Sequence, residues 1–144
     1  MKKKLLAMVL ALALLPVISL SAGALEPQDF AGGSLSGLAV DKNALLITDT
    51  FNKIIWRVEN GAVTRWAGKP GVADLHGEPS GAYVDAKLDE ARFMEPWAIA
   101  PYLDGYAVTD TAANVVRYVD GKTVRTAAGS GVKGQTNGSG ATVS

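Results

Sequence analysis

Few residues of this chain are of types that do chemistry, and they lie far apart in the sequence. His76 is the only histidine, it stands between Leu75 and Gly77 in a glycine-rich stretch, and the chain has no cysteine. No HxxxH pair, Ser-His-Asp set or glycine-rich phosphate loop can be assembled around it, so nucleophilic catalysis and a histidine or thiolate metal site are not indicated. We therefore expect His76 to be a solvated loop residue.

Two aspartates stand in the same short motif, Thr-Asp-Thr. The first motif is Thr48, Asp49 and Thr50, and the second is Thr109, Asp110 and Thr111, which lie 61 positions later. Carboxylates that recur in this way could bind a metal or act in catalysis. An aspartate directly after a strand also accepts N–H bonds from the turn ahead, and the following threonine hydroxyl can do so more weakly. Because both copies stand in the same local context, we interpret them as structural residues.

Aromatic side chains in two predicted loops are candidates for ligand contact. Tyr83 and Tyr102 lie where a ring could stack on a sugar or fill a pocket of a peptide partner. Trp56 and Trp97 are spaced as strand residues, and we interpret them as packing residues.

The two Thr-Asp-Thr motifs lie within a longer repeat, which predicts the elements that position them. Residues 37–68, GLAVDKNALLITDTFNKIIWRVENGAVTRWAG, align without a gap on residues 98–129, AIAPYLDGYAVTDTAANVVRYVDGKTVRTAAG. Each copy contains four short apolar runs separated by turn-forming residues, at 37–40, 44–48, 54–58 and 62–67 and at 98–101, 105–109, 115–119 and 122–127. Four antiparallel strands repeated at a fixed period predict an all-β fold made of β-propeller blades. Gly68 and Gly129 close the outer strands, where the chain turns toward the next blade.

The first 24 residues are interpreted as a signal peptide. Lys2, Lys3 and Lys4 precede the apolar run 5–20, and residues 22–24 offer a small-x-small cleavage site. Cleavage of this segment would leave no membrane span. The signal peptide therefore predicts a secreted or extracytoplasmic protein. Cleavage also removes three lysines, which leaves 11 basic against 14 acidic residues. This balance excludes a basic footprint for nucleic acid or for an anionic membrane surface.

Three segments lie outside the two predicted blades. Residues 25–36 form an N-terminal lead-in, and residues 69–97 form an insertion between the blades, in which 86–93 is predicted to be a short helix. Residues 130–144 are rich in glycine and serine, and we interpret them as a truncated connection to a further blade, with a flexible tail as the alternative. Two blades cannot close a ring, so we expect an incomplete propeller fragment.

The repeat resembles the NHL-repeat β-propeller family, in its secreted bacterial form. The matching residues of the first copy are Gly37-Leu38-Ala39-Val40-Asp41, Ile47-Thr48-Asp49-Thr50, Asn52, Ile55, Arg57-Val58, Val63 and Ala67-Gly68. Those of the second copy are Phe93, Pro96-Trp97-Ala98-Ile99-Ala100, Val108-Thr109-Asp110-Thr111, Asn114, Val116-Arg117 and Ala128-Gly129. The resemblance implies two blades of a six-bladed ring, with Phe93 inserted between consecutive blades. Phe51 and Ala112 replace the glycine that is usual in the turn, so we expect a turn that differs from the family's.

The resemblance also implies a function, that of an exported scaffold that binds protein or another ligand and has no intrinsic catalysis. The expected partner is an extracellular protein, a peptide or a cell-wall component, and no cofactor is expected. One alternative is a metal-dependent enzyme of gluconolactonase or lyase type. Glu95-Pro96-Trp97 resembles the segment in which a glutamate of those propellers binds a divalent cation such as calcium. Another alternative is a structural spacer domain of a larger surface protein.

Overall fold

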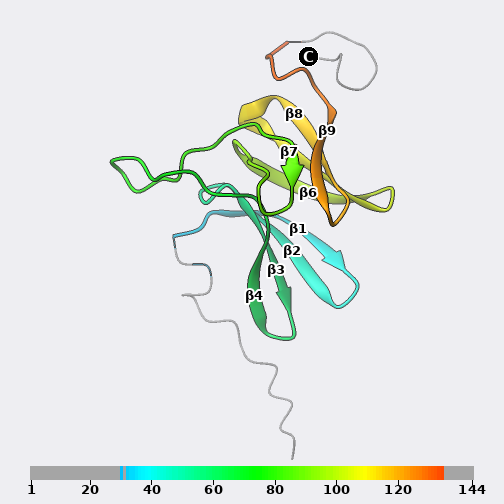
Figure 1. Cartoon of the computed structure of the whole chain (residues 1–144). Helices are drawn as coiled ribbons and strands as arrows, with labels where there is room; N and C mark the ends of the chain where they lie inside the picture. The colour runs from blue at the N-terminus through cyan, green and yellow to red at the C-terminus, as the bar shows by residue number, and fades with distance from the viewer. Residues whose placement is uncertain (1–29, 31, 135–144) are drawn as a thin grey trace, which may run out of the picture.

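The computed structural model describes residue 30 and residues 32–134, which fold into two antiparallel β-sheets (Figure 1). The first sheet has the strand order β1-β2-β3-β4, and the second has the order β5-β9-β8-β7-β6. The strands of the first sheet are β1 (Leu35–Asp41), β2 (Ala44–Asp49), β3 (Ile54–Glu59) and β4 (Ala62–Ala67). Those of the second are β5 (Ala86–Lys87), β6 (Pro96–Tyr102), β7 (Gly105–Asp110), β8 (Val115–Val119) and β9 (Thr123–Ala128). We call the two sheets the first and the second blade.

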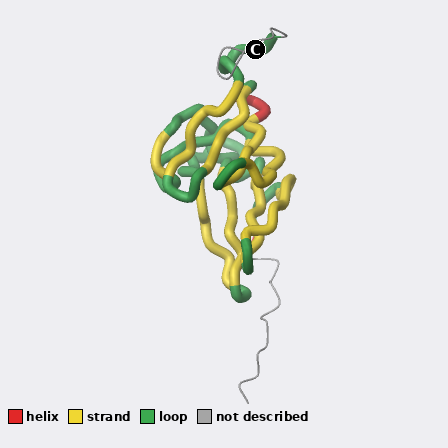
Figure 2. Tube along the Cα trace, turned by 90° about the vertical axis from the view of Figure 1, so that its right-hand side faces the viewer, coloured by secondary structure: helices red, strands yellow, loops and turns green. Residues whose placement is uncertain are grey.

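The strand register of the first blade recurs in the second at the offset found in the sequence. Ala39 pairs with Leu46 in the first blade, and Ala100 pairs with Ala107 in the second. Thr48 opposes Ile55, and Thr109 opposes Val116. The predicted all-β fold of blade-like sheets is therefore confirmed (Figure 2). The bounds of all eight predicted strands lie within two residues of the observed ones.

In the turn between the second and third strands of each blade, the residue with left-handed backbone conformation is the last one before the third strand. Lys53 has a φ of 61° and Asn114 a φ of 54°, whereas Phe51 and Ala112 do not have positive φ. The second blade forms this turn as a short 3₁₀ helix, η2 (Thr111–Ala113), with Asn114 as its left-handed C-cap. The left-handed strain that Phe51 and Ala112 would suffer is avoided because the turn places that conformation two residues further on.

The prediction of a helix over 86–93 is wrong, because the backbone of this segment forms hydrogen bonds with distant parts of the chain. Ala86 and Lys87 form β5 at the edge of the second blade, where they pair with Val124 and Thr123. A turn follows, in which the Lys87 carbonyl accepts the N–H groups of Glu90 and Ala91. The Leu88 carbonyl accepts from Gly68 N–H at 2.8 Å, and that of Ala91 accepts from Lys69 N–H at 2.7 Å. Long-range pairing of these backbone groups overrides the local helix propensity.

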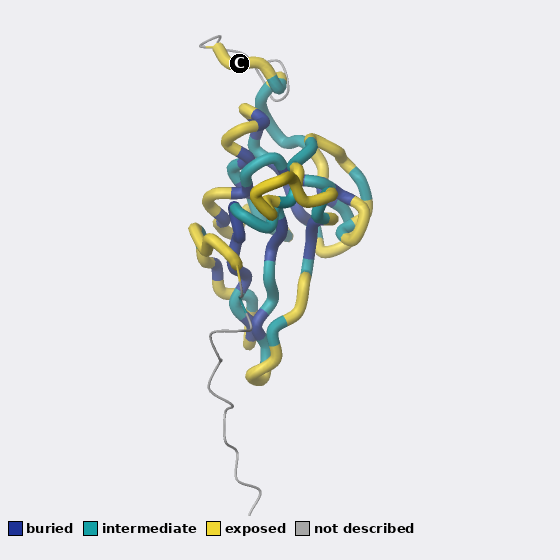
Figure 3. The backbone as a smooth tube through the Cα atoms, turned by 90° about the vertical axis from the view of Figure 1, so that its left-hand side faces the viewer, coloured by how far each residue is buried: buried dark blue, intermediate teal, exposed yellow. Residues whose placement is uncertain are grey.

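The core lies between the two blades. It is one cluster of buried apolar residues, which come from both sheets and from the insertion: Ala39, Leu46, Ile55, Ala67, Ala91, Phe93, Ile99, Val108, Val119 and Val124. Phe93 is completely buried, and a Cβ on Gly68 would lie 3.1 Å from its ring. Exposed residues gather at the hairpin ends and along the insertion (Figure 3). The expected insertion of Phe93 between the blades is confirmed.

Several predictions from the sequence concern residues outside the described part of the chain. These are the signal peptide over 1–24, half of the lead-in over 25–36 and residues 135–144 of the tail, since residues 1–29, 31 and 135–144 are not described. Among the described residues, no helix has the length and hydropathy needed to cross a membrane.

Candidate functional site

The Asp49 carboxylate is a buried hydrogen-bond acceptor at the start of a turn. It accepts from Ser34 N–H and Asn52 N–H, each at 3.0 Å, and from the Asn52 amide and Trp56 Nε1, each at 2.8 Å. Burial pushes the pKa of this carboxyl up, but the hydrogen bonds outweigh that effect and hold its pKa below the usual value of 3.8. One of its four donors, Asn52 N–H, belongs to the turn after the strand, as expected from the sequence.

Asp110 occupies the same position in the second blade but has different partners. It accepts from Met94 N–H and Glu95 N–H at 3.0 and 2.6 Å and from the Arg117 guanidinium at 3.2 Å. Arg117 stands where the first blade has Trp56, and both Asp110 and Arg117 are completely buried. An arginine in place of an indole replaces the neutral donor to this carboxylate by a cation and so forms a buried ion pair.

Arg117 also joins the second blade to the inter-blade insertion. Arg117 Nη2 donates to Asp85 at 2.6 Å and to the Val84 carbonyl at 2.9 Å. Arg117 Nη1, which bonds Asp110, also donates to the Arg92 carbonyl at 3.0 Å. The guanidinium lies 5.2 Å from the Phe93 ring centre. Sequence reasoning missed this role, although the replacement of tryptophan by arginine at one repeat position was the signal for it.

The threonines of the two motifs act as donors as well as acceptors. The hydroxyls of Thr50 and Thr111 donate to the carbonyls of Ser34 and Glu95, which differs from the acceptor role expected of them. Thr48 accepts from Gly37 N–H and donates to the Trp97 carbonyl at 2.7 Å, and so connects the blades. Gly68 and Gly129 have φ of +98° and +94°, which permits the turn after the outer strand.

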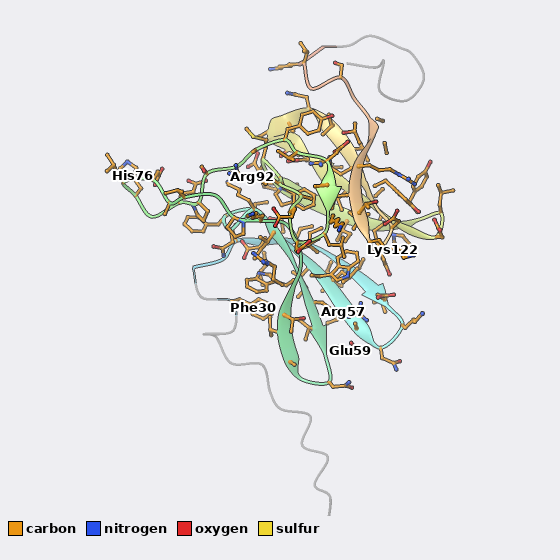
Figure 4. The ribbon with its side chains drawn as sticks, viewed as in Figure 1. Phe30, Arg57, Glu59, His76, Arg92 and Lys122 are labelled. Carbon is orange, nitrogen blue, oxygen red and sulfur yellow. The ribbon has the colours of Figure 1, made fainter. Side chains whose placement is uncertain are left out.

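A loop formed by residues 71–81 projects from the body of the protein, and His76 lies near its tip (Figure 4). Ala73 pairs with Pro79, and Ser80 N–H donates to the Val72 carbonyl at 3.0 Å. The Asp74 carboxylate accepts from the N–H groups of His76 and Glu78, at 2.8 and 3.0 Å. The loop is therefore internally hydrogen-bonded, as expected for an Asx turn in which a glycine, Gly77, takes a φ of +81°.

Apolar side chains are exposed on this projecting loop. Leu75 is 102% exposed and Val72 is 86% exposed. At its base, Lys53 of the first blade forms an ion pair with Glu78 at 2.8 Å, and the Arg92 guanidinium donates to the Ser80 carbonyl at 2.9 Å. These contacts hold the apolar tip in a defined position. No local sequence pattern predicts this bracing, because Lys53 and Arg92 lie outside the loop.

A groove of ≈ 480 Å³ separates the projecting loop from the η2 turn, and the charged residues that line it are Lys53, Asp74, Glu78 and Glu95. The Glu95 carboxylate accepts from the Thr111 hydroxyl at 2.9 Å. Within residues 30 and 32–134, no group of three or more His, Cys, Asp or Glu side chains is placed to hold a metal ion. The acidic groove can accept hydrogen bonds from hydroxyl or ammonium groups of a ligand.

The two candidate aromatics lie in different places. Tyr83 is 43% exposed, its hydroxyl is 2.5 Å from the Thr126 hydroxyl, and Arg117 lies under its ring. Tyr102 is 50% exposed and packs edge-to-face on Tyr118, with ring centres 6.1 Å apart. The structure therefore does not bring them into one site. Trp97, interpreted as packing, is 52% exposed.

Comparison with known proteins adds no assignment. No protein-family model matches the chain, and no curated protein matches it.

Proposed function

We propose that this chain is an exported binding scaffold of NHL-repeat propeller type and that its projecting loop contacts an extracellular protein or peptide. The observation that carries the proposal is the exposure of Leu75 and Val72 on a loop with its own hydrogen bonds. Exposed apolar side chains do not contribute to the core, but they contribute to binding when a partner covers them.

The bracing of the loop favours the same function. A loop that is already ordered loses little conformational entropy on binding, so more of the contact energy remains as affinity. The groove beside the loop adds acceptors at Glu78 and Glu95, which could pair with a lysine or a hydroxyl of the partner. An apolar tip next to an acidic groove fits a peptide that carries an apolar residue beside a basic one.

The proposal is tested by selecting ligands for the full chain from a displayed random-peptide library. Leu75→Ser is expected to weaken binding of the selected peptides about tenfold or more, because it removes the exposed apolar contact. Leu103→Ser is the matched control, since Leu103 is also exposed, at 79%, but lies in the β6–β7 hairpin. Both variants should retain the circular dichroism spectrum and melting temperature of the wild type.

Two outcomes contradict the proposal. The first is a selection that returns no peptide. The second is a set of peptides that the Leu75→Ser variant binds as tightly as the wild type.

A further inference from the structure

Three arginines of the described residues are buried or half-buried, and they differ in whether their charge is balanced. Arg117 forms ion pairs with two aspartates, and Arg57 forms ion pairs with Asp41 and Glu59. Arg92 is half-buried as well, but it forms no ion pair with any carboxylate of the described residues. A charge that is partly removed from water without a counter-charge is unfavourable. The charge of Arg92 is therefore not accounted for by the contacts within the described part of the chain.

The hydrogen bonds of Arg92 leave part of its guanidinium unused. Nη2 donates to the Ser80 carbonyl at 2.9 Å and to the Ser80 hydroxyl at 3.3 Å. Nε is buried and has no hydrogen-bond partner among the described residues, and Nη1 makes no hydrogen bond to them either. A neutral donor would be enough to bond Ser80, so this contact does not explain why the residue is a cation. The guanidinium keeps the capacity to bind an anion.

Arg92 lies at the base of the projecting loop, and its position is fixed on two sides (Figure 4). Its backbone N–H donates to the Val84 carbonyl at 3.1 Å, and its carbonyl accepts from Val84 N–H at 3.3 Å and from Arg117 at 3.0 Å. Gly71 lies against the guanidinium, because a Cβ on Gly71 would collide with Arg92 Nη2 and with Ser80 Oγ. A donor that is already in position loses little conformational entropy when it binds a ligand.

The guanidinium lines a groove of ≈ 380 Å³ at the first arm of the projecting loop, which we call the Arg92 groove. Lys69 and Glu90 also line it and form an ion pair at 2.6 Å, with both side chains more than half exposed. An ion pair this exposed is weak, so Lys69 can turn to an anion in the groove. Pro70 and Val72, which is 86% exposed, add an apolar wall. The groove therefore fits a carboxylate that is attached to an apolar group.

The groove lined by Asp74, Glu78 and Glu95 lies at the returning arm of the same loop and has the opposite charge balance. It holds one cation and three carboxylates, whereas the Arg92 groove holds two cations and one carboxylate. Ser80 lines both grooves, so they meet at the base of the loop. A ligand that covers the apolar tip can therefore reach a positive groove and a negative groove at once.

We propose that the Arg92 groove binds a carboxylate of the peptide that the projecting loop contacts, with Arg92 as the main donor and Lys69 as a second cation. That the ligand is a peptide rests on the proposed function, whereas the carboxylate rests on the residues of the groove. The preferred peptide carries an acidic group, an apolar residue and a basic residue close together. The carboxylate comes from an aspartate or glutamate side chain or from the C-terminus of the peptide, and the two sources differ in the test.

The groove is tested without a peptide, by NMR titration of the full chain with N-acetyl-leucine and with its uncharged amide. The Nε–H signal of Arg92 should shift with the acid and not with the amide, because a carboxylate forms charge-assisted hydrogen bonds with a guanidinium. Arg92→Gln should weaken binding of the acid about tenfold or more, measured at the Val72 amide. Arg125→Gln, which changes an exposed arginine of β9, is the matched control and should bind the acid like the wild type.

Two further variants keep the test decisive whatever the stability of Arg92→Gln. Lys69→Gln changes an exposed side chain, so it should fold like the wild type and weaken binding of the acid several-fold. Gly71→Ala should weaken it as well, because the added methyl group displaces the guanidinium from Ser80. Inorganic phosphate is titrated in parallel, and a stronger effect of phosphate than of the acid would contradict the assignment to a carboxylate.

The peptides selected for the proposed function identify the source of the carboxylate. Each peptide is synthesised with its acidic side chains as amides, or with its C-terminus as an amide. The form that lacks the bound carboxylate should bind the wild type about tenfold more weakly. Arg92→Gln should bind both forms about equally, because the partner of the carboxylate is already absent. Leu75→Ser should weaken both forms by the same factor.

The outcomes separate this inference from the proposed function. The inference is overturned if the acid and the amide of N-acetyl-leucine act alike, or if Arg92→Gln and Lys69→Gln bind the acid as tightly as the wild type. It is also overturned if the selected peptides depend on Leu75 but lose no affinity when their carboxylates are removed, and the proposed function then stands. A selection that returns no peptide contradicts the proposed function, and the N-acetyl-leucine titration still decides whether the groove binds a carboxylate.

Discussion

Replacing Arg117 by alanine tests whether its buried guanidinium fastens the inter-blade insertion to the second blade. The Arg117 and Asp110 side chains are both 0% exposed, and Arg117 also bonds Asp85 and two backbone carbonyls. Removing one partner of a buried ion pair costs about 3–5 kcal/mol. Asp110 keeps its bonds from Met94 and Glu95 N–H, so we expect a value near the lower end of that range, about 3 kcal/mol. The melting temperature should fall by roughly 10–25 °C.

The measurement is urea unfolding followed by tryptophan fluorescence, combined with hydrogen exchange. Val84 and Arg92 exchange backbone hydrogen bonds with each other beside the guanidinium, so their amides should lose protection in the variant. Arg117→Lys should be almost as unstable as Arg117→Ala, because an ammonium cannot reproduce the planar fork of donors. Arg125→Ala is the control: Arg125 is exposed and stacks on Tyr118, a contact worth about 0.5–1 kcal/mol. The reasoning is refuted if Arg117→Ala unfolds within about 1 kcal/mol of the wild type and Val84 stays protected.

Three further predictions concern the blades and their turns. Phe93→Ala should lower the free energy of unfolding by about 3–5 kcal/mol and Phe93→Leu by much less, in urea titrations, since Phe93 fills the core between the blades; equal losses would contradict its role. The pKa of Asp49 is lowered on folding, so this residue adds stability above about pH 4, and that stability is lost as the pH falls through the folded pKa. Asp49→Asn should therefore flatten the acid side of a stability-against-pH curve measured by thermal unfolding, and an unchanged acid side would count against the assignment. Lys53 has a φ of 61°, and replacing it with asparagine, the residue at the equivalent position 114, should raise stability by up to about 1 kcal/mol; a lower melting temperature would show that its ion pair with Glu78 matters more.

The strands of both blades could be predicted because the same pattern of apolar and turn-forming residues occurs twice in the sequence. A run such as Ile54 to Val58 is ambiguous alone, but its recurrence at Val115 to Val119 in the same turn context points to one structure. The burial of Phe93 was available from the resemblance, and the acceptor role of Asp49 followed from its position after a strand. Local pattern and tertiary structure agree in these segments.

The inter-blade insertion could not be predicted, because distant partners decide its structure. The run from Ala86 to Phe93 has helix-forming residues, yet its backbone pairs with Lys122, Val124 and Gly68. The projecting loop depends on Asp74 bonding to Glu78 N–H and on Lys53, 25 positions before Glu78. No periodicity in the segment itself encodes contacts of this kind.

The two blades differ at one repeat position, where the first has Trp56 and the second has Arg117, and this difference affects how the chain folds. A protein that contains two copies of one unit can misfold by exchanging strands between the copies. A third strand of the second blade placed in the first would put Arg117 beside Asp49 without Asp85 and the two backbone carbonyls that accept its hydrogen bonds in its own blade, and the reverse exchange would leave Asp85 and Asp110 without their cation. Such mispaired chains carry an electrostatic penalty, so one substitution between otherwise similar repeats distinguishes each strand's own sheet from its sister's.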